Sequence, residues 1–308
     1  MKLKLAFFLG MAVLSQLAHG QDAHVSLAND LVRLTASADG GRVVWFGFAD
    51  GGNVLQGPPS DTAPRGTGWA RVYPTLDSFG AAMGGSVCEP ESPFQGTWHL
   101  EKISAGEVKM TSPACGRTGV RMVRRLRLCP GEPAVQLLTR VEAVGNPAWP
   151  ACVWSVAGLP VPDVILLDAV PLRQAPGGSR VVDWWMAKPE CQGITLDVRP
   201  LDERTVVFTP KGARLGKLGT QGGWIAAVYD WGVFVMSAPY DPAGSYADGA
   251  SLEAFACPAY VEIETVGPLA VLKRGASIEV MEEWRLLRGA KLTPAAAAKL
   301  VRQKLKQN

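Results

Sequence analysis

Short apolar runs, rich in Val, Ile, Phe and Trp, follow one another along the second half of the chain, and Gly, Pro, Asn or Asp separates nearly every run from the next. They read CVWSVAG, DVILLDAVPL, SRVVDWWM, ITLDVRPL, TVVFTP, WIAAVYDW and GVFVMSAPY. Their apolar residues do not recur at the 3.6-residue period of an amphipathic helix. Many short strands at this spacing are typical of a β-sandwich or barrel rather than of alternating strands and helices. The sequence therefore predicts an all-β fold, a large antiparallel β-sandwich.

The segments 120–128 and 134–144 give the strongest indication of antiparallel pairing. The residues CPGE at 129–132 join them and suit a type II turn, which favours Pro at its second position and Gly at its third. In the second segment alternate residues from Val135 to Val141 are apolar or Thr, and the positions between them include Gln and Arg. One dry face and one wet face are the pattern of an antiparallel sheet.

Basic residues are concentrated in the first of these two segments. We expect them to form a charged outer face of the sheet, with an anion-binding site as the alternative. The residues are Arg121, Arg124, Arg125 and Arg127.

The end of the chain predicts a short helix. Thr293 suits the N-cap, Pro294 suits the first turn, and the sequence AAAAKLVRQKLKQ that follows consists largely of good helix formers. We therefore divide the chain into a signal segment (1–20), one large β-sandwich domain (21–290) and a basic C-terminal helix or tail (291–308). A domain of this size can bury a substantial core.

The first twenty residues have the pattern of a secretory signal peptide. Lys2 and Lys4 precede an apolar run from Leu5 to Leu17, and Ala18-His19-Gly20 carries small residues at its two outer positions. Cleavage there predicts a periplasmic or secreted protein, and no other stretch is apolar over the length of a transmembrane helix. Cleavage also leaves 29 basic against 28 acidic residues, and this near-neutral balance argues against a nucleic-acid partner.

The cysteines predict disulfide bonds, because an even number in an exported chain usually pairs; one or two free buried thiols are the alternative. They are Cys88, Cys115, Cys129, Cys152, Cys191 and Cys257. None has the spacing of a zinc site, and only His24 and His99 remain after residue 20. No cofactor is predicted; a Ca²⁺ ion at the acidic loop around Asp241 and Asp248 is left open.

Two carboxylates, Glu262 and Glu264, mark the candidate site. They lie two residues apart in a run, 259–266, whose β-branched and aromatic residues predict a strand, so both side chains share a face. Like charges on one face repel unless water, a cation or hydrogen-bond donors intervene. This face is therefore expected to hold something polar; the alternative is a pair of solvated carboxylates offset by nearby Lys or Arg.

Aromatic residues in Gly- and Pro-rich segments are the candidates for contact with a ligand. A long loop from residue 56 to 94 contains GWARVYP, in which Trp69, Arg71 and Tyr73 lie close together. Trp184 lies in a second such segment. Aromatic rings on functional loops often stack on a ligand, although a salt bridge of Arg71 within its loop is the alternative.

Four C-terminal segments resemble an uncharacterised family with the galactose-mutarotase-like (aldose-1-epimerase-like) supersandwich fold. They are SLEAF, AYVEIETVGPL, KRGAS and EEWRLL. The earlier GGRVVWFGFADGGNVL and GWARVYP are similar to that family too, so the resemblance covers most of the chain after residue 20. In sugar mutarotases a Glu on a C-terminal strand is the general base, a His protonates the ring oxygen and an Arg holds the sugar. The resemblance implies that Glu262 takes the place of that Glu and Arg71 that of the Arg.

The same resemblance puts Trp154-Ser155 where a mutarotase carries its histidine. A missing acid should remove much of the roughly 10²- to 10⁴-fold that acid–base catalysis supplies. The proton donors left open are Glu264 and three tyrosines: Tyr73, Tyr246 and Tyr260.

We therefore expect an exported protein that binds a saccharide without conventional mutarotase activity. One alternative is an enzyme, either an isomerase of the aldose-epimerase kind or a polysaccharide lyase, with Glu262 as base. Another is a non-catalytic envelope module that binds protein.

Overall fold

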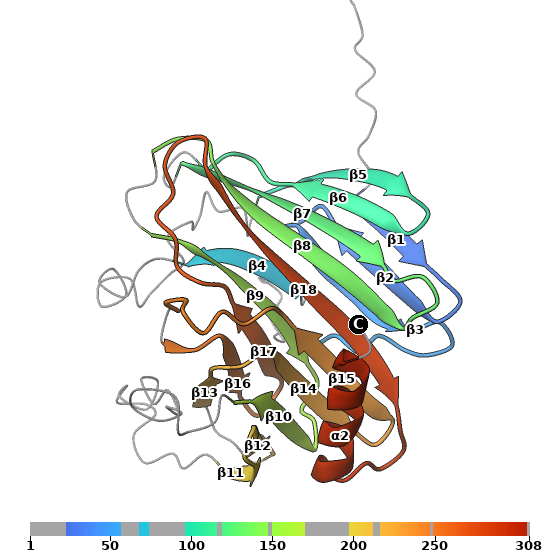
Figure 1. The fold of residues 1–308 in the computed structure, drawn as a ribbon. Helices are drawn as coiled ribbons and strands as arrows, with labels where there is room; N and C mark the ends of the chain where they lie inside the picture. Colours follow the sequence, from blue (N-terminus) through green and yellow to red (C-terminus); the bar gives the residue numbers. More distant parts are fainter. Residues whose placement is uncertain are drawn as a thin grey trace, which may run out of the picture.

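Two large antiparallel sheets and one helix make up the part of the protein that the structure describes (Figure 1). The computed structural model describes residues 23–56, 68–73, 96–115, 119–146, 150–169, 197–211, 216–246 and 249–306. The first sheet has eight strands, in the order β1 (His24–Ala28), β2 (Val32–Ser37), β3 (Arg42–Phe48), β4 (Gly68–Tyr73), β9 (Cys152–Leu159), β17 (Val261–Val266), β16 (Leu252–Ala256) and β13 (Gly216–Thr220).

The second sheet has ten strands. Their order is β11 (Asp197–Asp202), β12 (Thr205–Thr209), β10 (Val164–Asp168), β14 (Trp224–Tyr229), β15 (Gly232–Ser237), β18 (Ser277–Arg288), β8 (Ala134–Ala143), β7 (Val120–Leu128), β6 (Glu107–Thr111) and β5 (His99–Ser104). Every strand pair among the described residues is antiparallel. The predicted antiparallel β-sandwich is confirmed.

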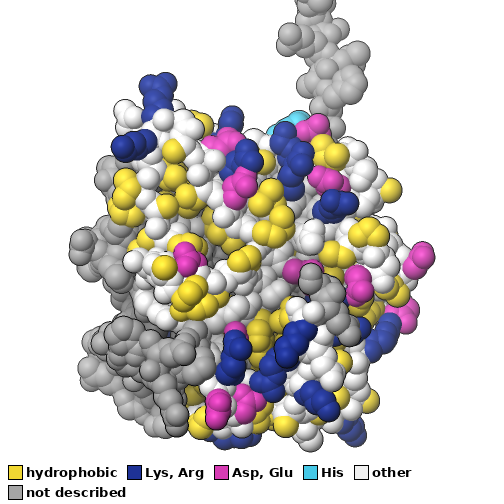
Figure 2. All heavy atoms as spheres, in the orientation of Figure 1, with side chains coloured by type: hydrophobic (Ala, Val, Ile, Leu, Met, Phe, Trp, Pro, Cys, Tyr) yellow, Lys and Arg dark blue, Asp and Glu magenta, His cyan; other side chains and the backbone are white. Residues whose placement is uncertain are grey.

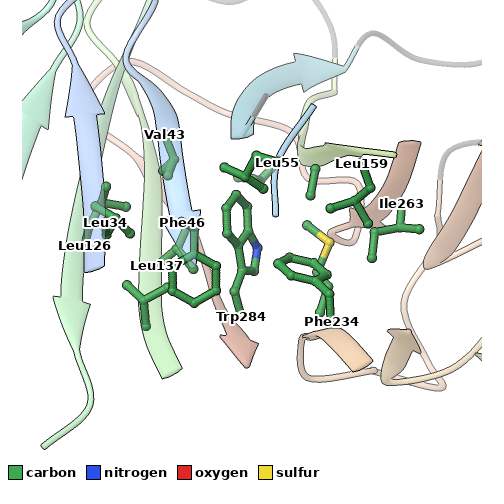
Figure 3. Packing of buried hydrophobic residues seen from close by; sticks show 14 of the residues in the cluster. Leu34, Val43, Phe46, Leu55, Leu126, Leu137, Leu159, Phe234, Ile263 and Trp284 are labelled. Carbon is green, nitrogen blue, oxygen red and sulfur yellow. The ribbon is translucent and has the colours of Figure 1, made fainter. Parts of the chain in front are cut away.

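The core lies between the two sheets, and Trp284 of β18 lies at its centre (Figure 3). Its indole is fully buried and packs edge-to-face against Phe46 of β3 and Phe234 of β15, with ring centroids 6.1 and 5.6 Å apart. Ile263 of β17 and Leu137 of β8 belong to the same cluster, so both sheets contribute to it. Large aromatic side chains of this kind supply much of the apolar area that a sandwich buries.

The β7–β8 hairpin has the predicted turn and alternation. Gly131 has a φ of 68°, and the Glu132 amide donates to the carbonyl of Cys129 at 3.3 Å, as a type II turn requires. Alternate residues of β8 from Val135 to Val141 are buried. The predicted outward basic cluster is wrong for one member: Arg124 faces the core and donates to the carbonyl of Gly41 at 2.9 Å.

The C-terminal helix, α2 (Pro294–Leu305), packs against the outer face of the ten-stranded sheet over β10 and β14 (Figure 1). Thr293 is its N-cap and accepts a hydrogen bond from the Ala296 amide at 3.3 Å. Ala297, Ala298 and Val301 are buried against the sheet. The predicted helix is confirmed, and it is too short to cross a membrane, as is any other helix within the described residues.

The cysteines do not form the predicted set of disulfides. Among the residues that the structure describes, Cys115, Cys129 and Cys257 carry free thiols. They lie in separate places: Cys115 opposite Val120, Cys129 in the β7–β8 turn and Cys257 in the β16–β17 turn. An even count of cysteines does not bring them together, and complete pairing of all six is therefore wrong. Cys88 and Cys191 lie outside the described residues.

Candidate functional site

The two glutamates of the candidate site lie on β17, on the face that points away from the core. The antiparallel register pairs Glu264 with Glu253 of β16, and Glu262 with Phe255 of the same strand. Residues directly opposite one another share a face. Because Ile263, between the two glutamates, lies in the core, Glu262 and Glu264 face outward from the eight-stranded sheet.

A buried ion cluster surrounds Glu264. The ammonium Nζ of Lys217, on β13, lies 2.6 Å from Oε2 of Glu253 and 2.9 Å from Oε2 of Glu264. Trp154 of β9 donates its indole N–H to the same Glu264 oxygen at 2.5 Å, and its ring centroid lies 5.0 Å from the Lys217 nitrogen. The side chains of Lys217, Glu253 and Glu264 are only 5%, 2% and 0% exposed. The Lys217 cation thus balances the negative charges of both Glu253 and Glu264, and Glu264 also accepts a hydrogen bond from Trp154.

This cluster keeps Lys217 charged. Burial lowers the pKa of Lys217, but the charges of Glu253 and Glu264 outweigh burial, and the net effect is a pKa above the ordinary lysine value. Glu264 is consequently held in one orientation by two partners on one oxygen. Its second oxygen, Oε1, is buried and accepts no hydrogen bond from the described residues. A buried acceptor of this kind is costly unless a donor meets it.

Beside the buried cluster lies a half-buried group formed by Glu262, Phe255 and Tyr260. The rings of Phe255 and Tyr260 are 6.1 Å apart and tilted by 52°. A backbone turn fixes Tyr260, since the Cys257 amide donates to its carbonyl at 3.0 Å. Burial, followed by the charge of Glu262, raises the pKa of the Tyr260 phenol, so the phenol keeps its proton at neutral pH. A carboxylate acceptor, a phenol donor and an aromatic surface therefore lie together.

A further carboxylate, Glu282 of β18, supports the site from the core side. It accepts hydrogen bonds from Ser155 Oγ at 2.8 Å and from Thr265 Oγ1 at 2.7 Å. Ser155 and Thr265 are the immediate neighbours of Trp154 and Glu264 in the sequence, on the core-facing side of the same strands. Burial raises the pKa of Glu282, opposed by these two hydroxyls and by the Arg124 guanidinium. Through its hydrogen bonds to Ser155 and Thr265, Glu282 links β9 and β17 to the opposite sheet.

The prediction that GWARVYP lies in a loop is wrong: residues 68–73 form the strand β4, whose backbone lies next to this site. Trp69, Arg71 and Tyr73 lie on β4, where their register partners on β9 are Val156, Trp154 and Cys152. Arg71 is thus in register with the tryptophan that contacts Glu264. The side chains of these three residues, and the whole of Trp184, lie outside the described part of the structure.

Other predicted groups lie elsewhere. The Tyr246 hydroxyl donates to the Asp241 carbonyl and accepts from the Asp241 amide, so it closes its own loop. The Asp241 carboxylate accepts from the Ala243 amide at 2.9 Å, and Asp248 lies outside the described residues. Within the described ranges no group of three or more His, Cys, Asp or Glu side chains is arranged to hold a metal ion.

Sequence reasoning missed Lys217 and Glu253. Lys217 lies in the unremarkable segment GKLGT, 47 residues from Glu264, and nothing local indicates the contact. Glu253 was detectable: in SLEAF it occupies a position that a hairpin with 261–266 would place beside Glu264. Trp154 was noted only as the residue in the histidine's place.

Comparison with solved structures identifies the fold. A candidate aldose 1-epimerase from Escherichia coli K12 matches with a TM-score of 0.60 at 12% identity, over 86% of this chain and 99% of that one. A galactose mutarotase-like protein from Lactobacillus casei matches with a TM-score of 0.59 at 12% identity, over 86% and 100%. A galactose mutarotase related enzyme from Lactobacillus acidophilus matches with a TM-score of 0.54 at 8% identity, over 87% and 98%.

No protein-family model matches the chain, and no curated protein sequence matches it either. Identities this low establish the fold alone. The chain therefore has the galactose mutarotase-like β-sandwich fold, as the sequence resemblance implied.

Proposed function

We propose that the protein binds a saccharide on the outer face of the eight-stranded sheet, beside Glu262 and Glu264. The observation that carries the proposal is the half-buried group of Glu262, Phe255 and Tyr260, which brings a carboxylate acceptor, a phenol donor and an aromatic surface together beside the buried cluster of Glu264. Sugar hydroxyls are donors suited to carboxylate oxygens, and sugar rings stack on aromatic side chains. The fold supports this choice, since the similar structures are described as mutarotase-like and epimerase-like proteins.

The arrangement favours binding over conventional mutarotation. Ring opening requires one group to remove a proton while another delivers one. Glu264 is committed to Lys217 and Trp154, and Lys217 is a poor acid because its pKa is raised. Trp154, at the place where the resemblance expects histidine, offers an N–H that does not titrate. Glu264 therefore positions Lys217 and Trp154, and Glu262, which is only half-buried, is the acceptor that a ligand can reach.

A second candidate function is catalysis on the same face, by an aldose-epimerase-like isomerase or a polysaccharide lyase. One observation favours it: Tyr260 lies beside Glu262, and burial and this carboxylate keep its phenol protonated. Glu262 would remove a proton and Tyr260 would deliver one. Of the three tyrosines left open by the sequence, Tyr246 is occupied within its own loop.

Two measurements test these proposals. Titration of the protein with D-galactose and D-glucose should quench tryptophan fluorescence saturably if a saccharide binds beside Trp154. Failure of every sugar tried would favour the third alternative, an envelope module that binds protein. Polarimetry of freshly dissolved α-D-galactose, together with an assay for polysaccharide cleavage, separates binding from catalysis. An enzyme accelerates one of these reactions, and Glu262→Gln and Tyr260→Phe abolish the acceleration; a binding protein accelerates neither.

The place of action is proposed from residues 1–20, whose pattern is that of a signal peptide. Removal of this segment would release the protein to the periplasm or the medium. Mass spectrometry of the protein from its native cells checks this, since an exported protein begins at Gln21 and a retained one keeps the apolar run.

A further inference from the structure

A charged groove lies on the outer face of the other sheet, across β6, β7 and β8. Its volume is about 530 Å³, and it is lined by Lys109, Thr111, Arg121, Val123, Arg125, Leu138, Arg140 and Glu142. Figure 2 shows Lys, Arg, Asp and Glu side chains interspersed over this part of the molecule, above α2. Four lining residues are cations and one is an anion, so the groove itself is basic.

The strand register forces two of these cations together. Lys109 of β6 lies directly opposite Arg125 of β7, and the next partner in the same row, on β8, is Leu138. Like charges directly opposite one another on neighbouring strands destabilise a sheet. In the adjacent row Arg140 adds a third cation, opposite Val123. An anion between these side chains would remove the repulsion.

Lys109 and Arg125 form only weak ion pairs with neighbouring glutamates. Lys109 lies 3.4 Å from Glu101, whose side chain is half exposed, and Arg125 lies 3.7 Å from Glu107, which is longer than a hydrogen bond. Exposed ion pairs of this kind contribute only about 0–1 kcal/mol. By contrast, Arg121 donates twice to Glu142, at 2.9 and 2.6 Å. Lys109 and Arg125 are thus the two cations most readily released to a ligand.

We propose that this groove binds the acidic groups, carboxylate or sulfate, of a charged polysaccharide, with Lys109 and Arg125 as the principal contacts. A sugar polymer brings isolated anionic groups, one on each charged unit, separated by neutral hydroxyls. Such spacing lets one group enter the basic centre while hydroxyls face the acidic rim formed by Glu101, Glu107 and Glu279. Duplex DNA carries one charge per about 1.7 Å of its axis, so its phosphates would meet the acidic rim as well as the basic centre.

This site is independent of the one proposed for Glu262 and Glu264, because it lies on the outer face of the opposite sheet. Binding of a neutral sugar beside Glu262 and Glu264 neither supports nor excludes binding of an anionic polymer in the basic groove. The two proposals can therefore fail separately.

The test measures binding of the full protein to oligogalacturonate, dextran sulfate and neutral dextran by calorimetry at low salt. We expect one or both charged polymers to bind, neutral dextran not to bind, and the affinity to fall as salt is added. The double variant Lys109→Gln/Arg125→Gln should bind at least about tenfold more weakly, since each charged hydrogen bond contributes about 1.5–3 kcal/mol. The polymer that binds distinguishes carboxylate from sulfate recognition.

The matched control removes the same charge from the helix α2 and its C-cap, as Lys299→Gln/Lys306→Gln; both positions are exposed. It should bind as the unmodified protein does. Equal losses in the two double variants would show a non-specific effect of charge and overturn the proposal. So would binding of neutral dextran as tight as that of the charged polymers, or tighter binding of duplex DNA.

Discussion

Replacement of Lys217 by Met tests whether the ion cluster at the candidate site is a buried unit. The substitution keeps a side chain of similar length but removes the charge between Glu253 and Glu264, whose oxygens lie 2.6 and 2.9 Å from the Lys217 nitrogen. Breaking a buried ion pair by removing one partner costs about 3–5 kcal/mol, because a charge is left uncompensated. We expect Lys217→Met to lower the free energy of unfolding by that amount at neutral pH.

The pH dependence gives the same magnitude by an independent route. The variant can relieve the repulsion if one of the two carboxyls binds a proton. At pH 7 that costs about 3.7 kcal/mol, at about 1.36 kcal/mol for each unit above an ordinary glutamate pKa of about 4.3. At pH 5 the same proton costs only about 1 kcal/mol. The loss of stability should therefore shrink steadily between pH 7 and pH 5.

Urea unfolding of both proteins across this pH range, followed by circular dichroism, is the assay. Lys109→Met is the matched control: it removes a lysine from an exposed ion pair and should cost no more than about 1 kcal/mol at any pH. A loss below about 1 kcal/mol for Lys217→Met at pH 7, or a loss that does not change with pH, would refute the assignment of a buried ion cluster.

Three further predictions concern the support of the site and the fold. Because burial raises the pKa of Glu282 above its ordinary 4.5, the protein should lose stability as pH rises through that raised pKa. Glu282→Gln should not show this loss. If the free energy of unfolding varied with pH in the same way for both proteins from pH 4 to 8, the prediction would be wrong. A Cβ at Gly232, where φ is 147°, would lie 2.1 Å from the Leu287 carbonyl oxygen. Gly232→Ala should therefore lower the free energy of unfolding in urea by at least about 1–3 kcal/mol. Gly52→Ala is the control and should cost less than about 0.5 kcal/mol, because a Cβ at Gly52 meets no atom within 4 Å. Thr293→Ala should cost about 1 kcal/mol and speed amide hydrogen exchange in the first turn of α2; unchanged exchange there would exclude a capping role.

Much of the fold could be predicted because it depends on local patterns. Period-two alternation placed the dry face of β8, and the Pro-Gly pair specified the turn before it. Alternation also separates Arg124 from Arg121, Arg125 and Arg127, since it is the only even-numbered member of the cluster. Applied to these four arginines, the alternation of a strand predicts that Arg124 faces the core, where the structure places it.

The chemistry of the site depends on contacts that sequence patterns do not record. The spacing of Glu262 and Glu264 predicted one shared face and a need for a cation or donors between like charges. It could not identify Lys217, which lies between Glu264 and Glu253 rather than between Glu264 and Glu262, because the strand order β17–β16–β13 brings these residues together across the sheet. For the same reason the sequence could not show that Glu264 is buried while Glu262 is only partly covered.

The central claim, that a saccharide binds beside Glu262 and Glu264, is tested most directly by saturation-transfer-difference NMR with D-galactose and D-glucose. Glu262→Ala removes an acceptor from the proposed site, whereas Glu279→Ala removes a half-exposed carboxylate from the opposite sheet. We predict transfer to the sugar ring protons in the unmodified protein and in Glu279→Ala, and its loss in Glu262→Ala. The account would be contradicted if saturation transfer persisted in Glu262→Ala, or if neither sugar showed transfer with the unmodified protein.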